Sequence, residues 1–276
     1  MIPVTTPEQV AGAIQQVKAA APNFCTNFFP AQSRLKAWID RRELIFQSYS
    51  GCAFFLRHDR DFHHLYFSAS DPENLEGTLP RLECLNSHGV TADLVGSEAS
   101  LQALVKAFWT AGFRQYSRLL RLSRAARTAE QLSDRGPSPK DPVTLAQPTD
   151  ASAVLALIES SFDRYADQLP VLYEIEHAIA ERQVLVVNSG GEIAALLFFE
   201  TQGLTSIVRY WVVADAFRSH GYGSMLMRHY WRSQANARRF VLWVRAANDD
   251  ALSKYRHYSY TPDGLVDHVM ANSMIK

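Results

Sequence analysis

The sequence predicts an α+β fold made of two halves, each with several helices and strands. Three observations carry this prediction. Apolar residues alternate between helical spacing and short strand-like runs along the whole chain. Residues 124–142 hold three prolines, one glycine and many charges, which is the composition of a linker. The same order of elements stands on both sides of that stretch.

The elements of the first half follow in a regular order. Helical spacing predicts helices over residues 7–20, 31–39, 72–85 and 101–109. Apolar and β-branched runs predict strands over residues 44–47, 52–56, 65–68, 90–95 and 117–122.

The second half repeats that order after a short apolar run at residues 143–146. Helices are expected over residues 149–165, 172–180, 221–234 and 249–258. Strands are expected over residues 184–187, 193–199, 204–214, 240–245 and 264–270. We therefore expect a domain over residues 1–127, a linker over 128–142 and a second domain over 143–276, the two domains being related by duplication.

The composition narrows the classes of function. The chain has 276 residues, with 28 basic and 28 acidic side chains. A neutral chain is not suited to non-specific binding of nucleic acid or an anionic membrane, so we expect neither partner. No apolar run approaches the roughly eighteen residues of a spanning helix, and the N-terminal segment lacks the pattern of a signal peptide. We expect a cytoplasmic protein, monomeric or homodimeric.

The cysteines and histidines do not predict a metal site. Cys25, Cys52 and Cys84 are odd in number and fit no zinc spacing, so we expect buried thiols. His63 and His64 have no third ligand at a suitable spacing, and we expect no metal. Residues 58–61, HDRD, are typical of a solvated hairpin turn.

Residues 210–227 carry the strongest functional signal. A strand leads through a loop into an amphipathic helix, and glycines in the loop allow a ligand to approach the backbone closely. Backbone N–H groups at a helix start have no intrahelical partner and attract anions. A glycine turn that merely opens a helix has the same appearance, so this segment alone only indicates a phosphate site. The loop and the first helical turn read Arg218, Ser219, His220, Gly221, Tyr222, Gly223 and Ser224.

A second signal lies downstream, where Asn248 follows a strand and opens a helix that carries Tyr255 two turns later. Singly, such residues are typical of an N-cap and of a core side chain. Together with the glycine loop, in this element order, they resemble the GNAT superfamily of acyl-CoA-dependent N-acyltransferases. The matches are V-x-x-x-N-x-x-A-x-x-x-Y at Val244, Asn248, Ala251 and Tyr255, and R/Q-x-x-G-x-G/A at Arg218, Gly221 and Gly223.

The resemblance covers residues 143–276. It implies the GNAT fold, a mixed, mostly antiparallel sheet flanked by helices, and a role for each matching segment. The amides of residues 219–224 would hold the CoA pyrophosphate, and Asn248 would contact the CoA arm. The backbone of Trp211, Val212 and Val213 would hold pantetheine and polarise the thioester. Tyr255 would protonate the departing thiolate, since a phenol with a pKa of about 10 can share a proton with a thiol of about 8.5. The implied reaction transfers an acetyl or short acyl group from acetyl-CoA directly to a primary amine in a ternary complex.

The base that deprotonates the amine stays open in the sequence. The family often places a Glu on a central strand, but residues 206–214 hold no carboxylate. Glu200, at the end of the preceding strand, is the candidate, and a proton relay through water is the alternative. Trp243 stands where relatives that acetylate protein N-termini carry a Glu, which disfavours such a substrate. Ser259 replaces a glycine that is usual in the family.

The first half fits the same template in part. Phe108 stands where the acid belongs and lacks a hydroxyl group. Asp71 and Glu73 begin the helix that would face the pyrophosphate and would repel it. We expect a degenerate GNAT-like domain in tandem with the catalytic one; an unrelated α+β domain is the alternative.

Two other functions stay open beside the acyltransferase. A Fem-like aminoacyl transferase also has two GNAT-like halves, but it would need a basic groove for RNA, which a neutral chain disfavours. A non-enzymatic acyl-CoA sensor or scaffold would tolerate the loss of the Tyr255 hydroxyl.

Overall fold

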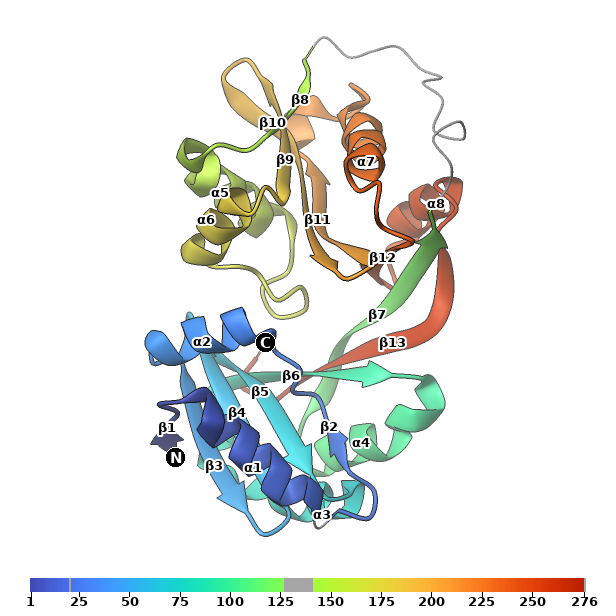
Figure 1. The fold of residues 1–276 in the computed structure, drawn as a ribbon. Helices are drawn as coiled ribbons and strands as arrows, with labels where there is room; N and C mark the ends of the chain where they lie inside the picture. Colours follow the sequence, from blue (N-terminus) through green and yellow to red (C-terminus); the bar gives the residue numbers. More distant parts are fainter. Residues whose placement is uncertain (20, 127–140, 276) are drawn as a thin grey trace. The chain divides into compact units, whose positions relative to one another are not determined.

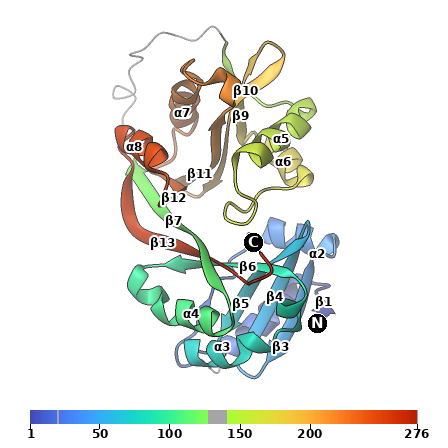
Figure 2. The same ribbon diagram turned by 180° about the vertical axis from the view of Figure 1, so that it is seen from behind.

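The chain forms two compact units in a computed structural model that describes residues 1–19, 21–126 and 141–275 (Figure 1, Figure 2). Unit 1 comprises Met1–Leu120, Arg245–Ala247 and Gly264–Lys276, and unit 2 comprises Arg121–Val244 and Asn248–Asp263. Strands β7 (Arg114–Ala125) and β13 (Thr261–Ala271) each contribute residues to both units, so neither unit is contiguous in sequence. Most of the predicted linker, residues 128–142, lies outside the described residues.

Unit 1 has a mixed sheet in the order β1-β3-β4-β5-β6-β13, and β2 is added to β5. β5 and β6 are parallel, and the other paired neighbours are antiparallel. Its strands are β1 (Ile2–Pro3), β2 (Cys25–Thr26), β3 (Leu44–Tyr49), β4 (Cys52–Asp59), β5 (Phe62–Ala69) and β6 (Gly89–Gly96). Its helices are α1 (Pro7–Ala19), α2 (Gln32–Asp40), α3 (Pro72–Thr78) and α4 (Glu98–Thr110).

The helix predicted over residues 72–85 is wrong in its second part. α3 ends at Thr78, and two short helical turns, Leu79–Arg81 and Glu83–Asn86, follow it. Pro80 explains the break, because proline lacks the N–H of an α-helical hydrogen bond and its ring collides with the preceding turn. The short strands β1 and β2 were not predicted, since two residues show no periodicity.

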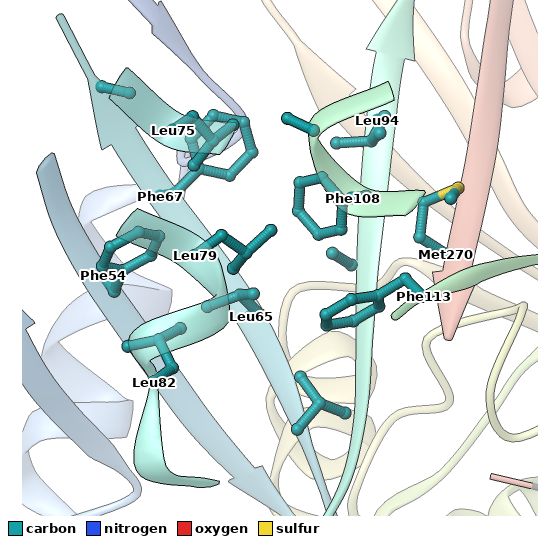
Figure 3. Close-up of a cluster of buried hydrophobic side chains, with 14 of the residues drawn as sticks. Phe54, Leu65, Phe67, Leu75, Leu79, Leu82, Leu94, Phe108, Phe113 and Met270 are labelled. Atoms are coloured by element: carbon teal, nitrogen blue, oxygen red, sulfur yellow. The ribbon is translucent and has the colours of Figure 1, made fainter. Parts of the chain in front are cut away.

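Alternate residues of the central strands fill two cores on opposite faces of the unit 1 sheet. On β4, Phe54 belongs to the core beneath α3 and α4, and Phe55 belongs to the core beneath α1 and α2. Figure 3 shows the first of these cores, where Phe108 of α4 lies 5.8 Å from Phe67, measured between ring centroids. Met270 of β13 is fully buried in the same cluster. The last strand of the chain is therefore part of the hydrophobic core of unit 1.

The predicted solvated turn at residues 58–61 is wrong for Asp59, whose side chain is buried. Its Oδ2 lies 3.0 Å from Nε2 of His64, and the other nitrogen of that ring bonds Thr91. Burial acts to raise the pKa of Asp59, but the hydrogen bond with His64 and the charges of Arg57 and Arg60 outweigh it and lower the pKa to about 2. The guanidinium of Arg60, with Nη1 2.7 Å from Oδ1, pairs with this buried carboxylate.

Unit 2 has a mixed sheet in the order β12-β11-β10-β9-β8. β11 and β12 are parallel, and the other neighbours are antiparallel. Helices α5 and α6 cover one face of this sheet and α7 covers the other (Figure 1, Figure 2). The elements are β8 (Val143–Leu145), α5 (Ala151–Ser161), α6 (Leu172–Ala180), β9 (Val184–Ser189), β10 (Glu192–Gln202), β11 (Thr205–Val213), α7 (Tyr222–Ser233), β12 (Arg239–Arg245) and α8 (Asp249–His257).

The two units repeat local detail as well as element order. α4 and α8 both end with a residue in the left-handed region, Gly112 at φ 87° and Ser259 at φ 62°. The same pair of backbone hydrogen bonds closes each helix, which is the Schellman arrangement. These bonds run from Phe113 N to Phe108 O and from Gly112 N to Trp109 O in α4, and from Tyr260 N to Tyr255 O and from Ser259 N to Arg256 O in α8. Phe108 and Tyr255 thus hold the same position in their helices, as the sequence alignment predicts.

No helix within the described residues is long and apolar enough to cross a membrane.

Candidate functional site

The predicted phosphate loop joins β11 to α7 in unit 2. A short helical turn, Asp215–Phe217, follows β11, and the chain then passes through two left-handed residues, Ser219 at φ 69° and Gly221 at φ 79°. Gly221 is the N-cap of α7 and has no side chain to bond the first-turn amides. The left-handed region is readily open to glycine and costs other residues free energy.

The backbone amides of this loop lack acceptors within the described chain. The first hydrogen bond of α7 runs from Met225 N to Gly221 O over 3.1 Å. No acceptor in the described residues bonds the six amides from Ser219 to Ser224. The positive end of the α7 dipole adds to their attraction for an anion. The loop that the sequence singled out therefore offers a set of free donors at a helix start.

The side chains of the loop are held by neighbours of their own. Arg218 forms an exposed ion pair with Asp215, with 2.6 Å between Nη2 and Oδ1. Nδ1 of His220 lies 2.9 Å from the carbonyl oxygen of Arg218, and its ring stacks on Tyr222. Because Asp215 already neutralises Arg218, the backbone amides offer the larger part of the attraction for an anion.

Gly223 sets how closely α7 approaches β11. A Cβ atom at this position would lie 3.3 Å from Cζ2 of Trp211 and 3.3 Å from Cγ2 of Val213. Both distances are tighter than ordinary van der Waals contact, so a larger residue would push the first turn of α7 away from the strand. At Gly223 the small size of glycine allows close helix–strand packing. At Gly221 the requirement is different, because the backbone there adopts the left-handed conformation.

β11 and β12 are paired for only a short distance. Their parallel register runs from Thr205 with Arg239 to Val208 with Leu242. Beyond this point, within the described residues, β11 keeps only its antiparallel partner β10, as far as Val213 with Ala195. One edge of the segment Trp211, Val212 and Val213 is thus left without a strand partner in the described chain. The resemblance predicts that this edge binds pantetheine.

A bulge in β11 occurs where the two parallel strands part. Phe198 faces Tyr210 and Phe199 faces Val208, so Arg209 is an extra residue without a partner on β10. A bulge bends a strand and re-aims its backbone groups. This bulge was not predicted, because a bulge leaves no distinct residue pattern in an apolar run.

Tyr255 lies on α8 and packs on Trp211 of β11, with 5.6 Å between ring centroids. Burial, and secondarily the neighbouring Tyr260, raise the pKa of the Tyr255 phenol above its ordinary value. The phenol is therefore protonated at neutral pH, which is the form that a general acid requires. Its hydroxyl has no hydrogen-bond partner among the described residues.

Asn248 is the N-cap of α8. Its Oδ1 accepts a hydrogen bond of 3.0 Å from the amide of Ala251. This hydrogen bond shows that Asn248 caps the helix, which is one of the two roles considered from the sequence. Its predicted contact with the CoA arm stays a prediction.

Glu200 lies beside Arg209, with 3.7 Å between Oε1 and Nε. Burial acts to lower the pKa of the Arg209 guanidinium, but Glu200, Tyr210 and Glu174 outweigh it and raise the pKa. Glu200 is therefore part of a largely buried charge cluster rather than a solvated strand end. Arg209 and Glu174 were not predicted as neighbours of this site, because they come from other elements and have no spacing relation to Glu200.

Ser224 and Tyr258 form a contact that links α7 to the end of α8. Their hydroxyl oxygens are 2.6 Å apart. The Tyr258 ring also packs edge-on against Trp211 at 5.8 Å. Tyr258 was not predicted as a site residue, because its neighbour Tyr255 alone matches the motif.

Three histidines of unit 1 gather around the turn between β4 and β5. The ring of His63 lies 5.2 Å from that of His58 and 5.0 Å from that of His88. Burial and the neighbouring imidazoles lower the pKa of His63 to about 4. Within the described residues, no group of three His, Cys, Asp or Glu side chains is arranged to hold a metal ion.

Comparison with known proteins identifies the domain that carries the loop and Tyr255. Residues 152–260 match the Acetyltransferase (GNAT) family. No curated protein matches the sequence at a significant level.

Solved structures are similar to the chain in fold. A tandem GNAT protein from the clavulanic acid biosynthesis pathway is 12% identical, with a TM-score of 0.59 over 98% of this chain and 96% of that chain. A GCN5-related N-acetyltransferase from Kribbella flavida is 14% identical, with a TM-score of 0.57 over 89% and 97%. Another from Sphaerobacter thermophilus is 13% identical, with a TM-score of 0.56 over 80% and 76%.

At these identities the solved structures speak for the fold alone, and they confirm the predicted α+β architecture with GNAT-like halves in tandem. The family match confirms the resemblance on which the roles of the loop and of Tyr255 rest. Residues 152–260 of this chain form an acetyltransferase domain of the GNAT family.

Proposed function

We propose that unit 2 transfers an acetyl or short acyl group from CoA to a primary amine, with acetyl-CoA as the donor. The observation that carries the proposal is the run of six backbone amides from Ser219 to Ser224 that lack acceptors in the described chain at the start of α7. A diphosphate is an acceptor of suitable charge for such a set. The free edge of β11 would then receive the pantetheine arm.

The chemistry follows from the groups around that edge. The amine nitrogen attacks the thioester carbonyl carbon and forms a tetrahedral intermediate. N–H donors of β11 would stabilise the oxyanion of this intermediate. Collapse of the intermediate breaks the C–S bond. The departing thiolate takes the phenolic proton of Tyr255, which burial keeps in place at neutral pH. No covalent acyl-enzyme is needed.

The proton of the attacking amine requires a separate acceptor. Glu200 is our candidate, and its Oε1 lies 3.7 Å from Nε of Arg209. Because this ion pair competes with the amine for the carboxylate, a relay through water stays the alternative. A Glu200→Gln variant separates the two alternatives. If Glu200 is the direct base, kcat should fall while the affinity for acetyl-CoA stays unchanged; if water relays the proton, kcat should stay unchanged.

The test of the proposed function is the Tyr255→Phe variant. We expect the rate of thiol release from acetyl-CoA with an accepted amine to fall by roughly 10²- to 10⁴-fold, which is typical for loss of a general acid. The dissociation constant for acetyl-CoA, measured by calorimetry, should stay within a few-fold, because the ring remains. Tyr116→Phe, in unit 1, is the matched control and should change neither quantity.

Two results would contradict the proposal. Failure of the wild-type chain to bind acetyl-CoA would remove its basis. Full biological activity of Tyr255→Phe, with acetyl-CoA bound as in the wild type, would favour a non-enzymatic acyl-CoA sensor.

A further inference from the structure

Unit 1 contains a pair of parallel strands in the same place of its element order as β11 and β12 in unit 2. β5 follows the antiparallel partner β4, as β11 follows β10, and a helix stands between the parallel strands in each unit. The parallel register of β5 and β6 runs only from Phe62 with Gly89 to His64 with Thr91. As in unit 2, the paired stretch is short.

In unit 1 a segment of the chain itself lies where the parallel strands part. Asn27 uses its carboxamide to bridge them: Nδ2 donates to the carbonyl oxygens of Leu65 on β5 and Asp93 on β6, both at 3.1 Å. Its Oδ1 accepts a hydrogen bond of 2.7 Å from the amide of Phe67. One side chain thus satisfies backbone groups on both strands.

The residues around Asn27 continue this pairing along β5. Cys25 and Thr26 form β2, in antiparallel register with Ala69 and Ser68. Phe28 fixes the end of the segment, because it is buried and its ring lies 4.7 Å from that of Phe55. The edge of β5 that corresponds to the free edge of β11 is therefore covered.

The N-terminus of α3, the helix that follows β5, is also occupied by a side chain of the chain itself. Asp71 caps α3, since its Oδ1 accepts a hydrogen bond of 2.7 Å from the amide of Asn74. Its Oδ2 accepts a further bond of 2.9 Å from the hydroxyl of Ser70. A carboxylate thus occupies the helix start, whereas the corresponding position in unit 2 is Gly221.

We propose that residues 25–28 are a built-in substitute for the acyl-CoA arm in unit 1, with the Asn27 carboxamide at the point where the strands separate, so that each chain binds one acyl-CoA. This inference rests on the proposed function of unit 2. It assigns unit 1 a filled site, occupied by its own backbone and an amide side chain, rather than a second transferase centre.

The test combines calorimetry with hydrogen exchange on the full chain, using acetyl-CoA as the probe. We expect one equivalent per chain. Exchange should slow in peptides covering residues 211–225 and stay unchanged in peptides covering residues 62–71. Gly221→Asp, which places a charge and a strained side chain in the unit 2 loop, should remove all measurable binding. Asn27→Leu should leave the stoichiometry at one and speed exchange of the Phe67 amide by about tenfold, because it removes the acceptor of that amide.

The outcomes distinguish this inference from the function on which it rests. Two equivalents per chain, one of them retained by Gly221→Asp, or slowed exchange at residues 62–71 in addition to residues 211–225, would overturn the filled site and leave the transferase proposal in place. A single equivalent that Gly221→Asp retains, with exchange slowed only at residues 62–71, would overturn both. Unchanged Phe67 exchange in Asn27→Leu would also count against the filled site. If the wild-type chain does not bind acetyl-CoA at all, both the filled site and the transferase proposal are wrong.

Discussion

Replacement of Gly221 by alanine tests the phosphate loop by thermodynamics. Gly221 has φ 79°, and an L-residue in the left-handed region costs roughly 1–2 kcal/mol. If the loop of Gly221→Ala keeps its conformation, that free energy is lost from stability. If the exposed loop relaxes instead, stability is preserved and the ligand must restore the conformation on binding, so Kd for acetyl-CoA rises by about 5- to 30-fold.

We expect relaxation, because Arg218 to Gly221 are exposed and only the Arg218–Asp215 ion pair and the contacts of the His220 ring hold them. Calorimetric titration with acetyl-CoA and urea unfolding of the same preparation measure the two parts of the strain. Gly221→Asn should give a smaller effect, since asparagine tolerates the left-handed region better. Gly12→Ala is the matched control: nothing lies within 4 Å of a Cβ placed there, so stability should rise by roughly 0.5–1 kcal/mol with Kd unchanged. If Gly221→Ala changes neither quantity, the reasoning about this loop is refuted.

Three further predictions concern charge and capping. The pKa of Asp59 is lowered to about 2, so its ionised carboxylate stabilises the fold. This stabilisation is complete above about pH 4 and is lost as the pH falls toward 2. Asp59→Asn should lose about 2 kcal/mol of unfolding free energy at pH 7, and its urea unfolding should not show that loss of stability in acid. The pKa of His63 is lowered to about 4, so the fold favours the neutral imidazole. The free energy of unfolding is at its full value above about pH 6.5 and falls as the pH falls toward 4. His63→Gln should remove up to about 3 kcal/mol of this pH dependence, and an unchanged pH profile would contradict the prediction. Asn248→Ala should cost about 1 kcal/mol through loss of the bond from Ala251, and an accompanying loss of acetyl-CoA affinity would show a contact beyond the cap.

Features that depend on local spacing could be predicted from the order of the residues. Glycines at a helix start, an asparagine two turns ahead of a tyrosine, and the repeated order of helices and strands are all readable along one dimension. They were sufficient for the fold class, for the GNAT resemblance of the second half, and for matching Phe108 of the first half to the position of Tyr255 in the second. The free amides from Gly221 to Ser224 follow from helix geometry, because every helix start leaves its first four N–H groups unpaired. Those of Ser219 and His220 depend on the path of the loop.

Tertiary structure decided everything that brings distant residues together. The burial of Asp59 depends on His64 across a hairpin, and the setting of Glu200 depends on the bulge at Arg209. The filled site of unit 1 depends on Asn27, whose bonds reach residues 38 to 66 positions away in the chain. The division of β7 and of β13 between the two compact units also depends on contacts between residues far apart in sequence. Such features arise from side-chain and backbone groups that must find partners in three dimensions, and sequence periodicity holds no record of those partners.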